Sequence, residues 1–178
     1  MTTENTQLVI LDIQGKLSQI VYKSEEVLHN SRILIEGSKL LELPIIWVEQ
    51  VPDKLGATHP VIAEILEGKT SVKKSSFSAW GNVEFRKELR ANNRKHVLLI
   101  GIETHICIYQ TALDLLAEGY EVSVIADAVS SRTESNKHIG LTMLRDAGAT
   151  LLSTEAVLFA LLCTAEHPRF KEIARLVK

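Results

Sequence analysis

The sequence predicts a three-layer α/β/α fold, with helices on both faces of a six-stranded, mostly parallel, doubly wound and Rossmann-like sheet. Short runs of aliphatic and β-branched residues alternate with longer segments of helical periodicity, as in successive βαβ units. The short runs are almost continuously apolar, which is typical of strands that are covered on both faces. The length of 178 residues suits one domain, so we expect a single domain over residues 1–178.

The predicted strands follow one another along the whole chain. Four of them are strong candidates, because each is a compact run of apolar residues with polar or turn-forming residues after it. Two others are shorter and carry more polar side chains. The strong candidates are residues 8–11, 45–48, 97–100 and 122–125, and the weaker ones are residues 70–73 and 150–152.

Helices are expected in the intervals between these strands. Residues 25–41 have apolar side chains at roughly helical spacing. Asn82 is expected to cap a helix that runs to Arg90. Phe170 and Ile173 lie on one side of a short amphipathic C-terminal helix, which either docks on its own chain or meets a second copy. The remaining helices are expected at about 105–118, 135–147, 155–163 and 170–177.

Composition argues against several classes of protein. Hydrophobic residues make up 46% and charged residues 24% of the chain, and the formal net charge is −2, so no basic footprint of a nucleic-acid binder is present. The longest apolar run, 156–163, is far shorter than the ~20 residues needed to span a bilayer. The first seven residues lack the apolar segment of a secretory signal. We therefore expect a cytosolic protein with no nucleic-acid or membrane partner.

Three reactive side chains follow strands of the predicted sheet. Asp12 comes directly after the first strand, Lys74 after the weak third strand, and Cys107 shortly after the fourth. Ligands of open α/β sheets bind beyond the carboxyl ends of the strands, where the strand order reverses. The sequence therefore predicts that these three residues share one edge of the sheet.

Cys107 is the candidate nucleophile of this group. Thr104 is expected to cap the following helix, which places Cys107 in its first turn. The partial positive charge at a helix start favours the thiolate, and free backbone N–H groups there suit a developing oxyanion. The alternative is that Cys107 is a small buried packing residue.

Asp12 and Lys74 are the candidate partners of the thiol. The Asp12 carboxylate would accept the thiol proton and return it to a leaving group. The Lys74 ammonium would lower the thiol pKa and offset charge that builds up during attack. Alternatively, Asp12 is a helix cap or a structural ion-pair partner, and Lys74 is a solvated surface lysine.

These motifs resemble those of the isochorismatase-like cysteine hydrolase superfamily, and within it the short isochorismatase domain-containing proteins. The first motif is an Asp at the end of strand 1 with a polar residue two places on, here Asp12 and Gln14. The second is a Lys four positions before Ser-Ala-aromatic, here Lys74 and 78–80. The third is Gly-aliphatic-x-Thr-x-x-Cys, here 101–107. The similarity extends through 153–172 and covers nearly the whole chain.

The resemblance implies an Asp–Lys–Cys triad that cleaves an amide, ester or related C–N or C–O bond of a small molecule. It implies a covalent thioester-type intermediate on Cys107, released by water that Asp12 activates. It also implies a cis peptide bond between Ile102 and Glu103. That bond would direct the Glu103 N–H, together with the N–H of Cys107, toward the oxyanion.

Substrate contacts are also expected from the resemblance. Gln14, the second residue of the first motif, and Trp80 are expected to contact substrate, with core packing as an equal alternative for Trp80. His105 adjoins the candidate nucleophile and is a third candidate, the alternative being that it faces solvent as a first-turn helix residue. Tyr109 is either a pocket residue or core, and core is the better interpretation.

No metal or other cofactor is expected. The nicotinamidases of this superfamily have an Asp-x-His metal motif after strand 2, whereas residues 48–53 of this chain contain no such pair, and a lone His59 does not replace it. The turn after strand 1 lacks the Gly-x-Gly-x-x-Gly sequence of dinucleotide binding. Family members form symmetric assemblies, so we expect a homo-oligomer, a dimer or larger.

Two other residues have structural interpretations. Cys163 lies among aliphatic residues and is expected in the core. Asp127 ends the fifth strand, in a structural stretch near the rim of the site or a subunit contact. The competing hypothesis for the whole chain is a catalytically idle scaffold that acts by binding a partner. A thiol redox function is disfavoured because the chain has no Cys-x-x-Cys pair.

Overall fold

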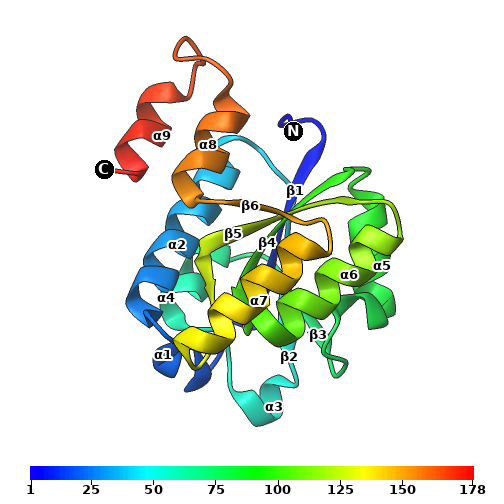
Figure 1. Cartoon of the computed structure of the whole chain (residues 1–178). Helices are drawn as coiled ribbons and strands as arrows, with labels where there is room; N and C mark the ends of the chain where they lie inside the picture. Colours follow the sequence, from blue (N-terminus) through cyan, green and yellow to red (C-terminus); the bar gives the residue numbers. More distant parts are fainter.

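The computed structural model describes all 178 residues and shows one six-stranded sheet between two layers of helices (Figure 1). The strand order is β3-β2-β1-β4-β5-β6, and every neighbouring pair is parallel. The predicted fold class is therefore confirmed, with a sheet that is parallel throughout. The strands are β1 (Thr6–Leu11), β2 (Ile45–Gln50), β3 (Val72–Lys74), β4 (His96–Ile102), β5 (Glu121–Ser130) and β6 (Thr150–Leu152).

The expected long helices are all present, and several short ones lie between them. Asn82 caps its helix as predicted, because its side chain accepts hydrogen bonds from the N–H groups of Glu84 and Phe85 at 2.8 and 3.0 Å. The longer helices are α2 (Ser24–Leu40), α5 (Val83–Ala91), α6 (Tyr109–Ala117), α7 (Glu134–Asp146), α8 (Thr154–Leu162) and α9 (Phe170–Leu176). The shorter ones are α1 (Leu17–Ile20), α3 (Pro52–Leu55), α4 (Pro60–Ala63), η1 (Glu64–Leu66), η2 (Ala79–Gly81) and η3 (Thr104–Ile108).

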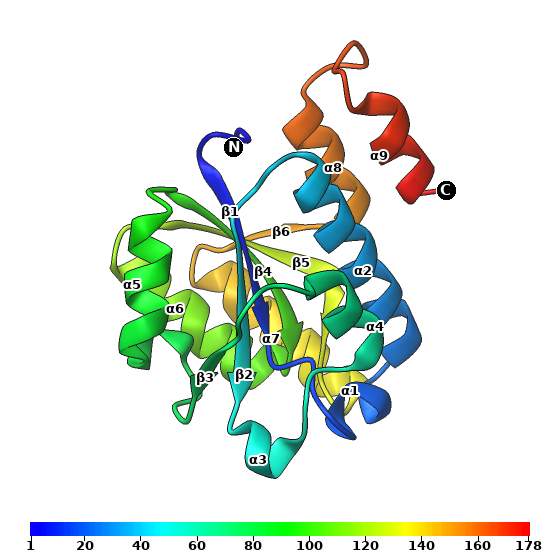
Figure 2. The same cartoon turned by 180° about the vertical axis from the view of Figure 1, so that it is seen from behind.

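The two faces of the sheet have separate cores. Helices α5, α6 and α7 cover one face, and α2, α4 and α8 cover the other (Figures 1 and 2). Alternate side chains of β1 point to opposite faces, so Leu8 and Ile10 join one core while Val9 and Leu11 join the other. All four are fully buried. This double burial explains why the strands are almost continuously apolar in sequence.

The C-terminal helix α9 packs on its own chain. Ile173 is fully buried in the core beneath α2 and α8, and the ring of Phe170 meets that of Phe159 edge-on at 6.1 Å. The apolar side of this helix is therefore used within the molecule. Cys163, which we expected in the core, is instead exposed at the end of α8, where the backbone turns with φ at 59°.

The strand order reverses between β1 and β4, because β2 and β3 lie on one side of β1 and β5 and β6 lie beyond β4. At this point Gly101 of β4 approaches β1 very closely. A Cβ atom on Gly101 would lie 1.9 Å from the carbonyl oxygen of Leu11, and its φ of +126° is strained for other residues. Only glycine therefore lets the ends of β1 and β4 approach in this way.

Candidate active site

Asp12 follows β1 at the point where the strand order reverses. Its backbone φ is 57°, in the left-handed region that Asp tolerates better than most residues. The Asp12 N–H donates to the Val48 carbonyl at 3.1 Å, which holds the turn against β2. The side chain is only 3% exposed, so its carboxylate needs a partner inside the protein.

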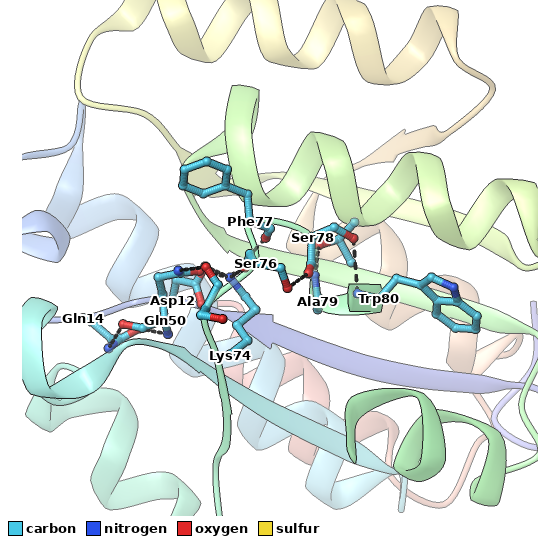
Figure 3. A network of polar contacts seen from close by, with 11 residues as sticks. Asp12, Gln14, Gln50, Lys74, Ser76, Phe77, Ser78, Ala79 and Trp80 are labelled. Carbon is cyan, nitrogen blue, oxygen red and sulfur yellow. Dashed lines mark hydrogen bonds and ion pairs between the residues drawn. The ribbon is translucent and has the colours of Figure 1, made fainter. Parts of the chain in front are cut away.

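Lys74, the last residue of β3, supplies that partner (Figure 3). Its Nζ lies 2.8 Å from Oδ2 of Asp12, and its side chain is 0% exposed. The ammonium also donates to the side-chain oxygen of Gln50 and to the carbonyls of Ser76 and Phe77 at 3.2 and 3.1 Å. Lys74 is therefore a fully enclosed ion-pair partner of Asp12, and the alternative of a solvated surface lysine is wrong.

Two glutamines fix this ion pair in place. Oε1 of Gln14 accepts from the Gln50 N–H at 2.7 Å, and Nε2 of Gln14 donates to the carbonyls of Gln50 and Gly56 at 3.2 and 2.8 Å. The Gln50 side chain in turn bonds Lys74 and donates to the Ser75 carbonyl at 2.8 Å. The network connects the ends of β1, β2 and β3, as Figure 3 shows.

Cys107 reaches the same place from β4. It lies in η3, which is a single π-helical turn that leads into α6. The thiol is 7% exposed and lies beside Asp12 and Lys74, whose charges both act on it. The second carboxylate oxygen of Asp12, Oδ1, is buried and has no partner of regular hydrogen-bond geometry. The structure thus brings Asp12, Lys74 and Cys107 together from three distant parts of the chain.

The surroundings of Cys107 favour the neutral thiol, whereas its position at a helix start led us to expect a thiolate. Burial raises the pKa of Cys107 to about 12, the negative charge of Asp12 adds to this, and Lys74 opposes it only in part. Thr104 is also not the helix cap that we expected. It lies inside the π-helical turn, and its hydroxyl is buried without a partner.

Burial also acts on the carboxyl group of Asp12. It raises the pKa of Asp12, while the charge of Lys74 and its hydrogen bond lower it. A raised pKa makes the carboxylate a better proton acceptor. The contact of Lys74 Nζ with Asp12 Oδ2 at 2.8 Å has the geometry of an ion pair, and the Cys107 thiol lies beside it.

The Ile102–Glu103 peptide bond is cis, at the position that the family resemblance implied. The Glu103 N–H makes no hydrogen bond to any acceptor of the protein. The Glu103 side chain turns to Arg132, and Oε1 accepts from the N–H and Nε of Arg132 at 3.0 and 3.1 Å. A free N–H close to the nucleophile is suited to bind a developing oxyanion.

A pocket of about 170 Å³ opens onto Cys107. Short helices that the sequence did not predict build part of its wall, because Leu17 comes from α1 and Leu55 from α3. Phe77 adds an aromatic ring that is half exposed. The residues that line the pocket are Asp12, Leu17, Gln50, Leu55, Phe77, Ile102, Glu103, Ile106 and Cys107.

None of the three predicted substrate contacts lines this pocket. Gln14 is buried in the network that holds Gln50. Trp80 points away from Asp12 (Figure 3), and its ring packs edge-on against Tyr120 at 6.2 Å. Nδ1 of His105 is hydrogen-bonded to the Ser131 hydroxyl at 2.9 Å. Each of these side chains is engaged in the protein's own packing or hydrogen bonding.

Three lining residues that sequence reasoning missed lie on short helices and a loop. Leu17, Leu55 and Phe77 follow strand ends closely in sequence, and an apolar residue among polar neighbours just after a strand was the available signal. Gln50 ends β2 at the same edge as Asp12. Gln50 lies two residues after the predicted strand 45–48, so the rule that ligands bind beyond the carboxyl ends of strands points to it.

No cluster of three or more His, Cys, Asp and Glu side chains is placed to hold a metal ion. No helix has the length and apolar character needed to cross a bilayer. Asp127 is structural, because its carboxylate accepts from the N–H and hydroxyl of Thr154 at the start of α8, both at 2.9 Å.

Comparison with known proteins identifies the family. A family model described as the isochorismatase domain matches residues 6–156. The chain belongs to the isochorismatase domain family. Among its relatives, isochorismatase domain-containing protein 2 of Bos taurus is 38% identical over 174 residues, which cover 98% of this chain and 83% of the relative. The predicted resemblance is therefore confirmed.

Solved structures agree with this assignment. A structure described as MAR1 ribonuclease from Caenorhabditis elegans is 35% identical, covers 99% of this chain and 91% of that chain, and has a TM-score of 0.93. The YcaC gene product of Escherichia coli, described as an octameric hydrolase of unknown specificity, also has a TM-score of 0.93 at 22% identity, covering 99% and 88%. This isochorismatase-domain chain thus has the fold of the family's hydrolases.

Proposed function

We propose that this isochorismatase-domain protein is a hydrolase of small molecules, with Cys107 as nucleophile, Asp12 as general base and Lys74 as the fixed positive charge beside them. The observation that supports it most is the meeting of these three buried side chains beside a pocket that Asp12 and Cys107 line. They come from the ends of β1, β3 and β4, where α/β sheets bind their ligands.

The first half of the proposed reaction forms a thioester. The Cys107 thiol passes its proton to Asp12 as sulfur attacks the carbonyl carbon, and a new C–S bond forms. The carbonyl oxygen becomes an oxyanion, which the free N–H of Glu103 and the N–H of Cys107 are proposed to bind. When the oxyanion collapses, the bond to the leaving nitrogen or oxygen breaks, and Asp12 gives that atom the proton.

The second half releases the product. The Asp12 carboxylate takes a proton from water as the water oxygen attacks the thioester carbon. The C–S bond then breaks, and Asp12 returns its proton to the sulfur of Cys107. The products are a carboxylic acid and an amine or alcohol, and the enzyme regains its starting protonation state.

Lys74 acts in this scheme without touching the substrate. Its ammonium is enclosed by Asp12, Gln50 and two backbone carbonyls, and it does not line the pocket. Its positive charge keeps Asp12 ionised despite burial, and it stabilises the anionic sulfur during attack. Gln50 positions the ammonium, because it bonds both Lys74 and the following loop.

Two other functions are less well supported. An idle scaffold would have no need for a buried ion pair beside a cysteine in a pocket. Ribonuclease activity, which the description of the C. elegans structure states for that protein, would require a site for phosphate groups. Here the two charged residues that line the pocket, Asp12 and Glu103, are both carboxylates, which repel phosphate.

Two finer expectations remain part of the proposal. We propose a cytosolic location, because both cysteines are free and no disulfide stabilises the fold. We also propose a homo-oligomer, since one structural neighbour is described as octameric. Size-exclusion chromatography with light scattering measures the mass in solution, and a mass of 19.8 kDa would contradict the oligomer.

The proposed function is tested by a hydrolysis screen over small amides and esters with the wild type and three variants. Cys107→Ala and Asp12→Asn are expected to lose at least about a hundredfold in kcat/KM, because each removes a group that forms or breaks bonds. Cys163→Ser is the control and should keep full activity. Hydrolysis that survives Cys107→Ala unchanged, or cleavage of RNA in place of all small substrates, would contradict the proposal.

A further inference from the structure

We infer that the pocket takes a small, electrically neutral and largely apolar acyl group and excludes substrates that carry a carboxylate. The inference rests on the proposed function, since it names the substrate class of the site at Cys107. It is drawn from three properties of the pocket: its apolar walls, the sign of its charges and its size.

Apolar side chains form most of the wall. Leu17, Leu55, Phe77, Ile102 and Ile106 all line the pocket. Groups of this kind bind apolar atoms by removing both surfaces from water. They have no charged or hydrogen-bonding group that would replace the water lost by a charged ligand when it enters the pocket.

No positive charge faces the ligand. The charged lining residues are Asp12 and Glu103, and both are carboxylates. Each already has a cation of its own, because Lys74 pairs with Asp12 at 2.8 Å and Arg132 pairs with Glu103 at 3.1 Å. A ligand carboxylate would therefore meet two like charges and find no free cation to pair with.

The volume limits the bound group. The pocket measures about 170 Å³, and an apolar cavity of about 150 Å³ holds one benzene molecule. An acyl group of about six non-hydrogen atoms therefore fits inside. Leu55 and Phe77 are 41% and 56% exposed, so they form an apolar rim over which a longer chain can extend.

Alkylation of Cys107 with iodoacetamide and iodoacetate tests the charge selectivity, because these reagents differ mainly in one negative charge. In each reaction the sulfur forms a bond to carbon, the C–I bond breaks, iodide leaves and the thiol proton passes to Asp12 or solvent. Peptide mass spectrometry gives both rates at Cys107 and at the exposed Cys163 of the same molecules. We expect the ratio of the iodoacetamide rate to the iodoacetate rate to be at least about tenfold higher at Cys107. Equal ratios at the two cysteines would overturn the inference.

A positive charge added at the rim of the pocket should weaken the preference of Cys107 for iodoacetamide over iodoacetate. Phe77→Arg places a positive charge on the pocket wall and should raise the iodoacetate rate at Cys107 severalfold. Val83→Arg is the matched control, because Val83 is 67% exposed on α5, does not line the pocket and adds the same charge. If both variants change the ratio of the iodoacetamide rate to the iodoacetate rate at Cys107 equally, the net charge of the protein causes the selectivity, and the inference fails.

Binding of small ligands to the Cys107→Ala variant tests the inference without any covalent reaction. Butyramide and butyrate have nearly the same shape and differ in charge. We expect butyramide to shift the backbone NMR signals of pocket residues at concentrations where butyrate does not. Equal or tighter binding of butyrate would overturn the inference. Failure of the hydrolysis screen would instead count against the proposed function alone.

Discussion

At the residue scale, the site holds its charges in an unusual state. The proposed nucleophile, Cys107, is a thiol whose pKa burial and Asp12 raise to about 12, and the proposed base, Asp12, is a carboxylate paired with a buried ammonium. Attack therefore requires proton transfer from Cys107 to Asp12 as the bond forms. Because the thiolate is the reactive form of cysteine, we expect this arrangement to slow oxidation and alkylation of Cys107.

Removal of Lys74 should cost both stability and activity. Lys74→Met leaves the Asp12 carboxylate buried without a counter-charge, which typically costs about 3–5 kcal/mol of unfolding free energy. Urea denaturation measures this, and kcat/KM should fall with it. Lys73→Met is the matched control, since the neighbouring Lys73 is exposed. Equal stability of both variants would show that the ion pair contributes nothing.

The thiol should also make stability depend on pH. The pKa of Cys107 rises from 9.0, its ordinary value, to about 12 in the folded protein. Between these pH values the unfolded chain releases the proton and the folded chain keeps it, so stability falls as pH rises. At pH 10 the loss is about 1 kcal/mol.

Cys107→Ser should remove this part of the pH dependence. Urea denaturation of the wild type and the variant from pH 7 to pH 11 measures it. Cys163→Ser, at an exposed cysteine, is the control and should follow the wild type. Parallel stability curves for the wild type and Cys107→Ser would show that the thiol pKa is not raised.

Sequence patterns predicted that Asp12, Lys74 and Cys107 lie together, but they did not predict the surroundings of these residues. Asp12, Lys74 and Cys107 were predictable because residues that end parallel strands meet at one edge of the sheet. The state of the thiol was not, because its pKa depends on burial and on the distance to Asp12, which only the folded chain defines. For Trp80, the packing of its ring against Tyr120 agrees with the alternative of core packing, and this contact too is defined only in the folded chain.

At the element scale, the close approach of β1 and β4 determines where the site forms. Gly101 allows it, because a side chain there would meet the Leu11 carbonyl just before Asp12. The π-helical turn η3 then carries Cys107 back toward that point. The site therefore depends on the pairing of these two strands.

Gly101→Ala should destabilise the fold by more than about 2 kcal/mol, because it adds a backbone clash to an unfavourable φ. Gly119→Ala is the matched control, since Gly119 has φ at +79° and open space around its Cα. That variant should lose only about 1 kcal/mol, the cost of the backbone conformation. Thermal unfolding compares the two, and equal losses would contradict the predicted clash.

The long elements were predictable, and the short helices were not. Strands and long helices carry an apolar period over many residues, and Asn82 marked a helix start correctly. Helices α1 and α3 have four residues each, too few for a period to appear. They are held by contacts with distant segments, such as Gly15 against the Leu55 carbonyl. Since these helices line the pocket, its shape was beyond the reach of sequence patterns.

At the scale of the whole molecule, the fold determines where the site lies but does not determine which substrate binds there. Two apolar cores bury the sheet from both sides and leave its carboxyl edge as the place for chemistry. The isochorismatase domain family shares this architecture. Specificity belongs to the pocket wall, which the loops and short helices of this chain supply.

The most direct test of the account is a pH titration of the Cys107 thiol in a Cys163→Ser background, with and without Asp12→Asn. The rate of alkylation at each pH reports the thiolate fraction. We predict a protonated thiol throughout the neutral range in the parent protein, with a pKa of about 12. Asp12→Asn should lower that pKa, because it removes the negative charge and leaves Lys74 beside the sulfur. A parent thiol that titrates near its ordinary value, or one that Asp12→Asn leaves unchanged, would contradict the proposed roles of both residues.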